Sequence, residues 1–315
     1  MIVADHVTKY YGETAAVLDL SFRIDHGQVI GLLGLNGAGK TTTLRILSGL
    51  TPPTSGRVTL GGVELTCDPE ELRARIGFLP ETPPLYGEMC VRDYLTFVAH
   101  IKGMRVGVRE AVDAALGATD LTAHAEAIID TLSFGFRRRV GIAQAVVHRP
   151  ALILLDEPTA GLDPVQILQM RRLIRALARE HTVIVSSHIL GEIHEMCDRI
   201  FVMQRGRIAA EGTEAELAGR LVGPTTVEIE VRGSKDSLVR VVAALPCVVR
   251  QELVGVVGNV CRMRVELRED ERDLLAAAIV GAGLGLLRLE RVRLELERIF
   301  LALTGESTST EAEAA

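Results

Sequence analysis

Short, continuous apolar runs alternate with helix-like segments over the first two thirds of the chain. Runs of this kind are typical of parallel strands that are buried on both faces. They predict strands at 2–8, 21–24, 29–33, 58–60, 76–79, 152–156, 182–186 and 200–203. Between residues 91 and 147 helical periodicity replaces the strand pattern. We therefore expect an α/β core into which a helical subdomain, about 91–147, is inserted.

The pattern restarts after Gly223-Pro224, a pair that breaks regular structure. A short helix at 214–221 is expected just before this break. The elements predicted after it are a strand at 227–231, a helix at 236–245, strands at 248–253 and 262–267, a helix at 269–282 and a strand at 284–292. This βαββαβ order is the split-βαβ, ferredoxin-like arrangement.

A last helix is predicted at 294–303, and an acidic tail at 305–315 has the composition of a disordered segment. The expected domains are therefore 1–222, an accessory α+β domain at 223–304, and the tail.

Residues 31–42 read GLLGLNGAGKTT and contain the phosphate-loop pattern G-x-x-x-x-G-K-[ST] between a predicted strand and a predicted helix at 42–50. The glycines let backbone N–H groups converge on a phosphate, and the helix N-terminus adds partial positive charge. Lys40 supplies a full charge for the outer phosphates, and the Thr41 hydroxyl is a ligand for Mg²⁺. The predicted nucleotide contacts are Asn36, Gly37, Ala38, Gly39, Lys40, Thr41 and Thr42. The alternative is a glycine-rich turn without a ligand.

Two acids end the apolar strand LILLDE, at the edge of the sheet where open α/β folds bind ligands. Asp156 is expected to hold Mg²⁺, and Glu157 is placed to act as the general base on an attacking water. The alternative is a strand that ends in solvated charge. Glu81 follows the strand 76–79 and is expected at the same edge as a further Mg²⁺ ligand, unless it faces solvent or a groove on another protein.

His188 follows a third buried strand, so it is also expected at this edge. A neutral imidazole can donate to a γ-phosphate oxygen and accept from a catalytic water. A capping or packing histidine is the alternative. In the segment LSFGFRRR, Ser133 is predicted to cap a helix. The three arginines that follow, 137–139, fit either a nucleic-acid patch or a solvated or phosphate-facing helix turn, and we favour the second.

The composition narrows the class of protein. A chain of 315 residues corresponds to about two domains. A net charge of −6 gives no general attraction for nucleic acid. Five scattered cysteines without a C-x-x-C pair fit a reducing cytoplasm. The longest uncharged stretch, 274–287, is shorter than the roughly 18–20 residues of a membrane span, and we expect a buried helix there that runs into a strand.

With these motifs in order, the chain resembles the ATP-binding subunits of ABC transporters. LSFGFRRRVGIAQAVVHRPALILLDEPTAGLDP resembles the family's signature, Walker B and D-loop, and VSSHIL resembles its switch-histidine segment. The resemblance implies that Tyr11, beside Tyr10 in KYYG, stacks on adenine. It also implies a head-to-tail dimer, here a homodimer, in which Ser133 and Gly135 contact ATP bound to the partner. Asp163 in the D-loop would be a further nucleotide-binding residue. A separate membrane permease would hold the subunit at the inner face of the cell membrane.

Two departures from the family pattern stand out. Glu81 occupies the position of the Q-loop glutamine, and Arg138 replaces a glutamine downstream of the signature. IGFLPETPPLYGEM together with LSFGF resembles the exporter branch with gliding-motility and multidrug-type ATP-binding proteins. The leading hypothesis is an ATPase that drives an exporter. A regulatory subunit with weak hydrolysis and a soluble ABC ATPase in DNA repair or translation are the alternatives.

Overall fold

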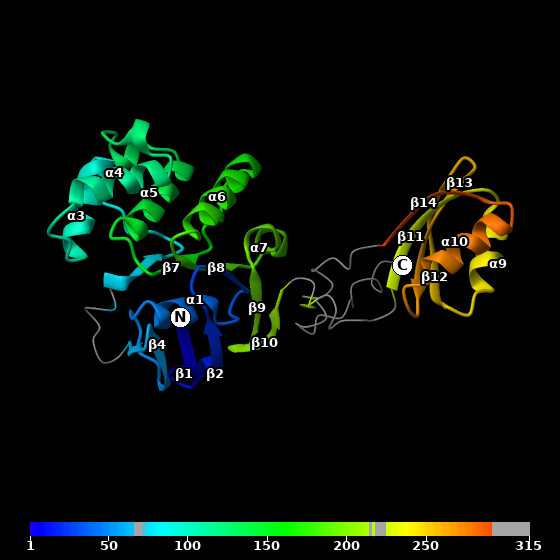
Figure 1. The fold of residues 1–315 in the computed structure, drawn as a ribbon, viewed down its shortest axis with the longest axis horizontal. Coiled ribbons are helices and arrows are strands. Elements are labelled where there is room, and N and C mark those ends of the chain that lie inside the picture. The colour runs from blue at the N-terminus through cyan, green and yellow to red at the C-terminus, as the bar shows by residue number, and fades with distance from the viewer. Residues whose placement is uncertain (66–71, 73, 214–215, 218–224, 292–315) are drawn as a thin grey trace. The chain divides into compact units, whose positions relative to one another are not determined.

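The structure is a computed structural model that describes residues 1–65, 72, 74–213, 216–217 and 225–291. The chain divides into two compact units, Met1–Glu214 and Ala215–Ala315, and each is described by itself (Figure 1). The predicted helix at 214–221 lies mostly outside the described residues, and the predicted helix at 294–303 and the tail lie entirely outside them. In the described part, no helix is both long enough and apolar enough to span a membrane.

A six-stranded, mainly parallel sheet forms the centre of the first unit. Its strand order is β10-β9-β3-β8-β7-β6, and only the pair β9–β10 is antiparallel. The strands are β3 (Val29–Leu33), β6 (Ile76–Leu79), β7 (Leu152–Asp156), β8 (Thr182–Ser187), β9 (Arg199–Gln204) and β10 (Arg207–Gly212). Because β3, β7 and β8 are parallel neighbours, the segments that follow them meet at one edge.

Alternate residues of β7 pack into two different cores. Leu152 and Leu154 belong to a cluster that includes residues of an antiparallel sheet, β2-β1-β4-β5. Ile153 and Leu155 belong to a second cluster with Leu95, Val140 and other helical residues. Burial on both faces explains why this strand is a continuous apolar run. The antiparallel sheet consists of β1 (Ile2–Tyr11), β2 (Thr14–Ile24), β4 (Ser55–Leu60) and β5 (Val63–Glu64).

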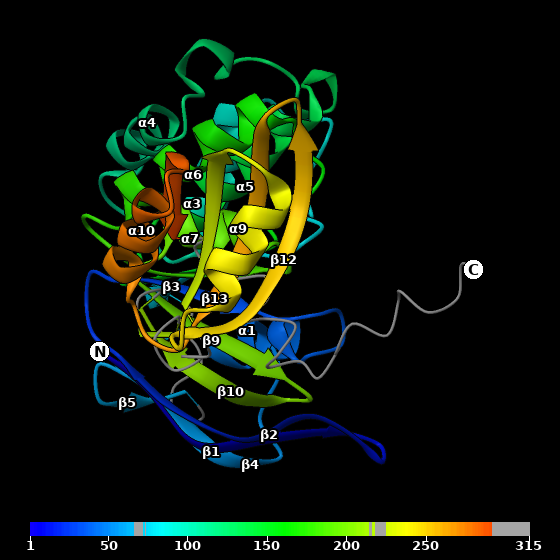
Figure 2. The ribbon, with the colours of Figure 1, turned by 90° about the vertical axis from the view of Figure 1, so that its right-hand side faces the viewer.

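Helices cover the first unit, and the predicted helical segment at 91–147 contains three of them. These are α3 (Val91–Ile101), α4 (Val108–Ala118) and α5 (Phe134–Val146), which lie together on the side of the six-stranded sheet away from β1, β2 and β4 (Figures 1 and 2). The other helices described here are α1 (Lys40–Leu47), α6 (Pro164–Leu177) and α7 (Leu190–Met196).

The second unit is an antiparallel sheet with two helices. Its strand order is β12-β13-β11-β14, and the elements are β11 (Thr225–Arg232), α9 (Lys235–Ala243), β12 (Val248–Val257), β13 (Val260–Leu267), α10 (Arg272–Gly281) and β14 (Gly285–Arg291). Its apolar core joins alternate residues of β11 and β13 to Leu238 of α9 and to Leu275 and Ile279 of α10.

Several predicted boundaries were wrong. The helix after the phosphate loop begins at Lys40 instead of residue 42, because Gly39 takes a left-handed conformation (φ 102°) directly before it. It ends at Leu47, two residues before Gly49, which has φ 72°. The strands β5 and β10 were not predicted, since neither contains the continuous apolar run used to find the others. The segment 274–287 is also less buried than expected: Leu274 and Val280 of α10 are 51% and 59% exposed.

Candidate functional site

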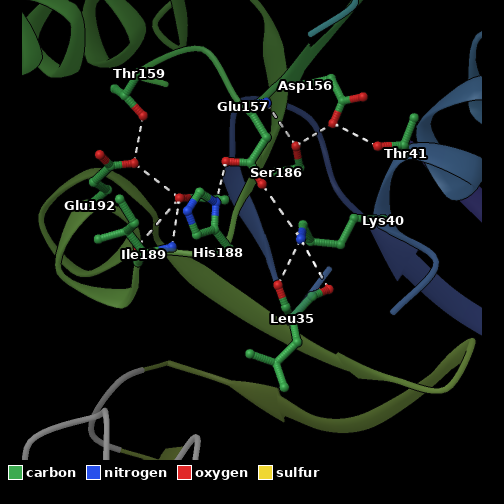
Figure 3. A network of polar contacts seen from close by, with 12 residues as sticks. Leu35, Lys40, Thr41, Asp156, Glu157, Thr159, Ser186, His188, Ile189 and Glu192 are labelled. Carbon is green, nitrogen blue, oxygen red and sulfur yellow. Dashed lines mark hydrogen bonds and ion pairs between the residues drawn. The ribbon is translucent and has the colours of Figure 1, made fainter. Parts of the chain in front are cut away.

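The phosphate loop connects β3 to α1 at the carboxyl ends of the parallel strands of the six-stranded sheet. Gly39 must be a glycine on two grounds: its φ of 102° is left-handed, and a Cβ there would lie 2.5 Å from the Ala16 carbonyl oxygen. The Lys40 ammonium is buried and donates to the carbonyl oxygens of Gly34 (2.6 Å) and Leu35 (3.3 Å). The loop is therefore a tight backbone turn with a buried cation at its centre (Figure 3).

Asp156 lies at the end of β7, directly opposite Ser186 of β8 in the strand register. Its Oδ1 accepts hydrogen bonds from the Ser186 hydroxyl at 2.6 Å and the Thr41 hydroxyl at 3.3 Å (Figure 3). Its Oδ2 is buried and has no hydrogen-bond partner in the described part of the chain. One carboxylate oxygen is thus fixed by two hydroxyls while the other remains free to bind a ligand.

Glu157 connects Asp156 to the other charged groups. Its Oε1 is 3.5 Å from the Lys40 ammonium, and its Oε2 is 2.9 Å from Nδ1 of His188. Its backbone N–H donates to the Ser186 hydroxyl at 2.9 Å. Its φ of 48° is unusual for a residue with a side chain. Lys40, Asp156, Glu157 and His188, which are scattered over 149 residues of sequence, therefore share one network.

A cavity of about 370 Å³ opens over this network. It is lined by all seven predicted contacts of the phosphate loop, Asn36, Gly37, Ala38, Gly39, Lys40, Thr41 and Thr42. Tyr11, Glu81, Glu157 and His188 line it as well, together with Thr14, Ala15, Ala16, Leu35 and Ala160. The neighbouring Tyr10 is not a lining residue, so the geometry selects Tyr11 from the pair. Asp156 lies beneath the surface, 1% exposed.

Three predicted contact residues do not line this cavity. Ser133 caps α5, its hydroxyl accepting a hydrogen bond from the Phe136 N–H at 3.4 Å, as the sequence predicts. Gly135 lies in the first turn of the same helix, where a Cβ would come within 2.9 Å of the Gln166 side chain. Asp163 caps α6 through a hydrogen bond from the Gln166 N–H. These residues gather at the start of two helices rather than around the phosphate loop.

Comparisons with known proteins agree with this arrangement. The ABC transporter family profile matches residues 17–160. The linearmycin resistance ATP-binding protein LnrL of Bacillus subtilis (strain 168) is 31% identical over 98% of this chain and 99% of its own length. The chain belongs to the ABC transporter ATP-binding proteins. It is thus an ABC ATPase, a subunit that binds and hydrolyses ATP to drive transport.

Other relatives share the same role. The Nod factor export ATP-binding protein I of Rhizobium etli is 36% identical over 95% of this chain and 92% of its own length. The bacitracin transport ATP-binding protein BcrA of Bacillus licheniformis is 39% identical over 67% of this chain and 69% of its own length. A solved dimer of the ABC transporter cassette MJ0796 has a TM-score of 0.62 and 28% identity, over 68% of this chain and 98% of that one.

In this ABC ATPase one of the three arginines after the signature, Arg138, does not have the predicted setting, whereas Arg137 and Arg139 are partly exposed. Arg138 is only 3% exposed, so it is neither part of a nucleic-acid patch nor solvated. Its guanidinium donates to the carbonyl oxygens of Glu81, Glu157 and Pro158. Sequence reasoning missed this because the three acceptors come from loops that are distant in the chain.

Ser186 and Glu192 were also missed. Ser186 joins Asp156 to the backbone of Glu157, and a sequence signal for it was available, because Ser186 is the last residue of the predicted strand 182–186. Glu192 of α7 is buried and accepts hydrogen bonds from the Thr159 hydroxyl at 2.5 Å and the Ser187 hydroxyl at 3.0 Å. Through these two bonds Glu192 joins the loop after Glu157 to the segment before His188, so it holds both sides of the site together.

Proposed function

We propose that this ABC ATPase drives a separate membrane permease in the outward direction. The observation that carries the proposal is the match along nearly the whole chain to proteins named for linearmycin resistance and Nod factor export. Through the permease, the subunit would lie at the inner face of the cell membrane. A neighbouring reading frame for a multi-span protein, and ATP-dependent efflux from vesicles that hold both subunits, would test this proposal.

The roles of the site residues follow from their chemistry. Lys40 offers its charge to the outer phosphates of ATP, and the backbone N–H groups from Asn36 to Thr42 surround them. Glu157 takes a proton from a water as the water oxygen attacks the γ-phosphorus. The bond to the β,γ-bridging oxygen breaks, and ADP carries away the electron pair. His188 contacts the Glu157 carboxylate at 2.9 Å and lines the same cavity as Lys40, so its imidazole could donate to a γ-phosphate oxygen.

The residues around Asp156 fit a magnesium ion. Mg²⁺ prefers hard oxygen ligands, and the free, buried Oδ2 of Asp156 lies beside the Thr41 hydroxyl that already contacts Oδ1. Glu81, on the cavity wall, adds a third candidate oxygen ligand. When bound, Mg²⁺ would neutralise charge on the β- and γ-phosphates. The three side chains would hold the ion where Lys40 already attracts phosphate.

We propose that two copies of the chain close head to tail around two ATP molecules. Ser133 and the exposed start of α5 lie outside the cavity of their own chain, so they are available to a nucleotide held by a second copy. Gly135 in the same turn is buried against the Gln166 side chain, and Asp163 caps α6 a few residues after Glu157 in the chain. The solved cassette dimers of related ABC transporters support this arrangement.

A Glu157→Gln variant tests the role of Glu157 and the dimer together. Loss of a general base slows turnover by about 10²-fold or more, while the similar shape of glutamine preserves ATP binding. We expect the variant to form a dimer with ATP and Mg²⁺ in size-exclusion chromatography. Glu110→Gln, on the exposed start of α4, is the matched control and should behave like the wild type. A Glu157→Gln protein that hydrolyses ATP at the wild-type rate would refute the assignment.

One observation favours a second candidate function, a regulatory subunit that closes on ATP and hydrolyses it slowly. Glu81 places an acid on the cavity wall where the family pattern has glutamine. Its charge would repel the γ-phosphate when no metal is bound. The steady-state ATPase rate of the purified chain, with and without its permease, separates this candidate from the first.

An exposed apolar cluster, defined as Tyr86, Phe97 and, one turn further along α3, Ile101, offers a surface for the permease. Tyr86 and Phe97 are 56% and 38% exposed, and their ring centroids lie 5.5 Å apart. Ile101 is 66% exposed. Exposed apolar clusters mark contact sites for other proteins. Charged substitutions in this cluster should reduce co-purification with the permease and leave the ATPase activity of the free subunit unchanged.

For the domains, we propose an ATP-binding domain at 1–222 and a ferredoxin-like accessory domain at 223–304. The element order β11-α9-β12-β13-α10-β14 and the sheet order β12-β13-β11-β14 support the ferredoxin-like assignment. The two units have separate apolar cores. A soluble fragment 1–222 that binds ATP is the expected result, and an insoluble one would make the second unit part of the core fold.

A further inference from the structure

Arg138 is a buried cation at the centre of the loops that form the catalytic site. It lies about one turn into α5, and only 3% of its surface is exposed. Burying a guanidinium removes it from water at a considerable cost, so its donors need partners. Desolvation lowers the pKa of Arg138, and the nearby carboxylates of Glu81, Asp156 and Glu157 oppose that change.

All three acceptors of the guanidinium are backbone carbonyl oxygens. Nη1 donates to Glu81, Nη2 donates to Glu157, and Nε donates to Pro158 at 3.2 Å. Arginine suits this task because its planar fork presents donors in several directions at once. Lysine has a single nitrogen, and a glutamine side chain has one donor nitrogen and an oxygen that would face a carbonyl.

The contact to Glu157 completes the support of an unusual backbone. Glu157 has a φ of 48°, a conformation that is unfavourable for a residue with a side chain and persists only when its surroundings enforce it. Ser186 accepts the hydrogen bond of its N–H, and Arg138 donates to its carbonyl oxygen. With both sides of the residue held, the carboxylate is directed toward Lys40 and His188.

We propose that Arg138 is a positioning residue for ATP hydrolysis that fixes the backbone of Glu157 and joins it to the Glu81 loop and to helix α5. This inference rests on the proposed role of Glu157 as general base. The same helix begins at Ser133, the residue proposed to contact ATP in the partner. Arg138 thus provides a direct connection from that contact to the base of its own chain.

The test replaces Arg138 by methionine, which keeps an unbranched apolar stem and removes every donor. We expect kcat to fall by about 10- to 100-fold, as for other supports of catalytic groups, while KM for ATP changes less than about threefold. Arg138→Lys should recover part of the rate because it keeps the charge and one donor nitrogen. Arg139→Met is the matched control: Arg139 contacts Thr119, Asp120 and Gln169, away from the site, and its loss should leave kcat within about twofold.

The same substitution made in the Glu157→Gln variant distinguishes a positioning role of Arg138 from a general loss of stability. If Arg138 acts through Glu157, Arg138→Met should have little further effect on the residual rate of Glu157→Gln, measured with radiolabelled ATP. An equal loss in both backgrounds, or an unchanged kcat of Arg138→Met, overturns the proposal. If Arg138→Met does not fold, the kcat of Arg138→Lys tests the proposal instead. A wild-type kcat in Arg138→Lys would also overturn the proposal. A wild-type rate for Glu157→Gln alone would instead refute the general base.

Discussion

Removing the Ser186 hydroxyl should weaken both the fold and the proposed magnesium site of this ABC ATPase. Ser186 is fully buried, and its single oxygen takes part in two hydrogen bonds. It donates to Asp156 Oδ1 at 2.6 Å and accepts from the Glu157 N–H at 2.9 Å. In Ser186→Ala the carboxylate loses its shorter hydrogen bond, and a buried backbone N–H loses its acceptor.

The cost follows from these two bonds. A hydrogen bond to a charged group contributes about 1.5–3 kcal/mol, and a buried N–H without a partner costs about 1–3 kcal/mol. Because the neighbouring groups relax in part, we expect a total near the lower end, about 3 kcal/mol. For a domain of this size that corresponds to a decrease in Tm of about 6–12 °C. Asp156 then keeps only the 3.3 Å bond from Thr41.

The second effect concerns the metal. Loss of a hydrogen-bond partner of a metal ligand reduces metal affinity by about 10- to 100-fold. If Asp156 binds Mg²⁺ as proposed, the Mg²⁺ concentration for half-maximal ATPase activity should rise by that factor. Thermal unfolding and a Mg²⁺ titration of the ATPase rate are the two assays. Ser187→Ala is the control, because Ser187 is equally buried but bonds Glu192 and Ile189. It should lower Tm without changing the Mg²⁺ dependence.

The reasoning is refuted by a Ser186→Ala protein whose Tm and Mg²⁺ dependence both match the wild type. An equal change of Mg²⁺ dependence in Ser186→Ala and Ser187→Ala would also refute it, because the effect would then not depend on the bond to Asp156.

Three further results are expected. Glu81→Gln should keep Mg·ATP hydrolysis within about tenfold, or about 1.4 kcal/mol, and should improve ATP binding in EDTA, since a repelling charge is lost. If the wild type and the variant bind ATP with the same affinity in EDTA, and again in Mg²⁺, Glu81 does not belong to the metal site. Burial lowers the pKa of His148 to about 4, with a smaller contribution from Lys102. As the pH falls, the unfolded chain therefore binds a proton at His148 before the folded chain does. The free energy of unfolding, measured by urea denaturation, should decrease between pH 6.5 and 4 by up to about 1.4 kcal/mol per pH unit. His148→Gln should reduce that slope. Gly39→Ala should lose ATP binding in an equilibrium titration because of the clash with Ala16, whereas Gly49→Ala, with no atom near its Cβ, should retain it.

The sequence by itself determined the nucleotide motif and the strands that support it. The phosphate loop is a local pattern, so its glycines and Lys40 are readable from twelve consecutive residues. The runs at 29–33, 76–79 and 152–156 are confirmed with their predicted limits, because burial on both faces leaves an unbroken apolar signal. Since ligands bind at the carboxyl ends of such strands, Asp156, Glu157 and His188 could be assigned to one edge.

Only the tertiary structure decided which polar groups meet one another. Tyr10 and Tyr11 are equivalent in sequence, and the cavity distinguishes them because neighbouring strand residues point to opposite faces. Arg138 belongs to a run of three arginines that looks solvated, yet its acceptors lie 57, 19 and 20 residues away in the chain. A hydrogen bond between distant loops leaves no periodic trace in the sequence. It forms because burial of the surrounding apolar strands brings the polar ends of those loops together, and there each donor must find an acceptor.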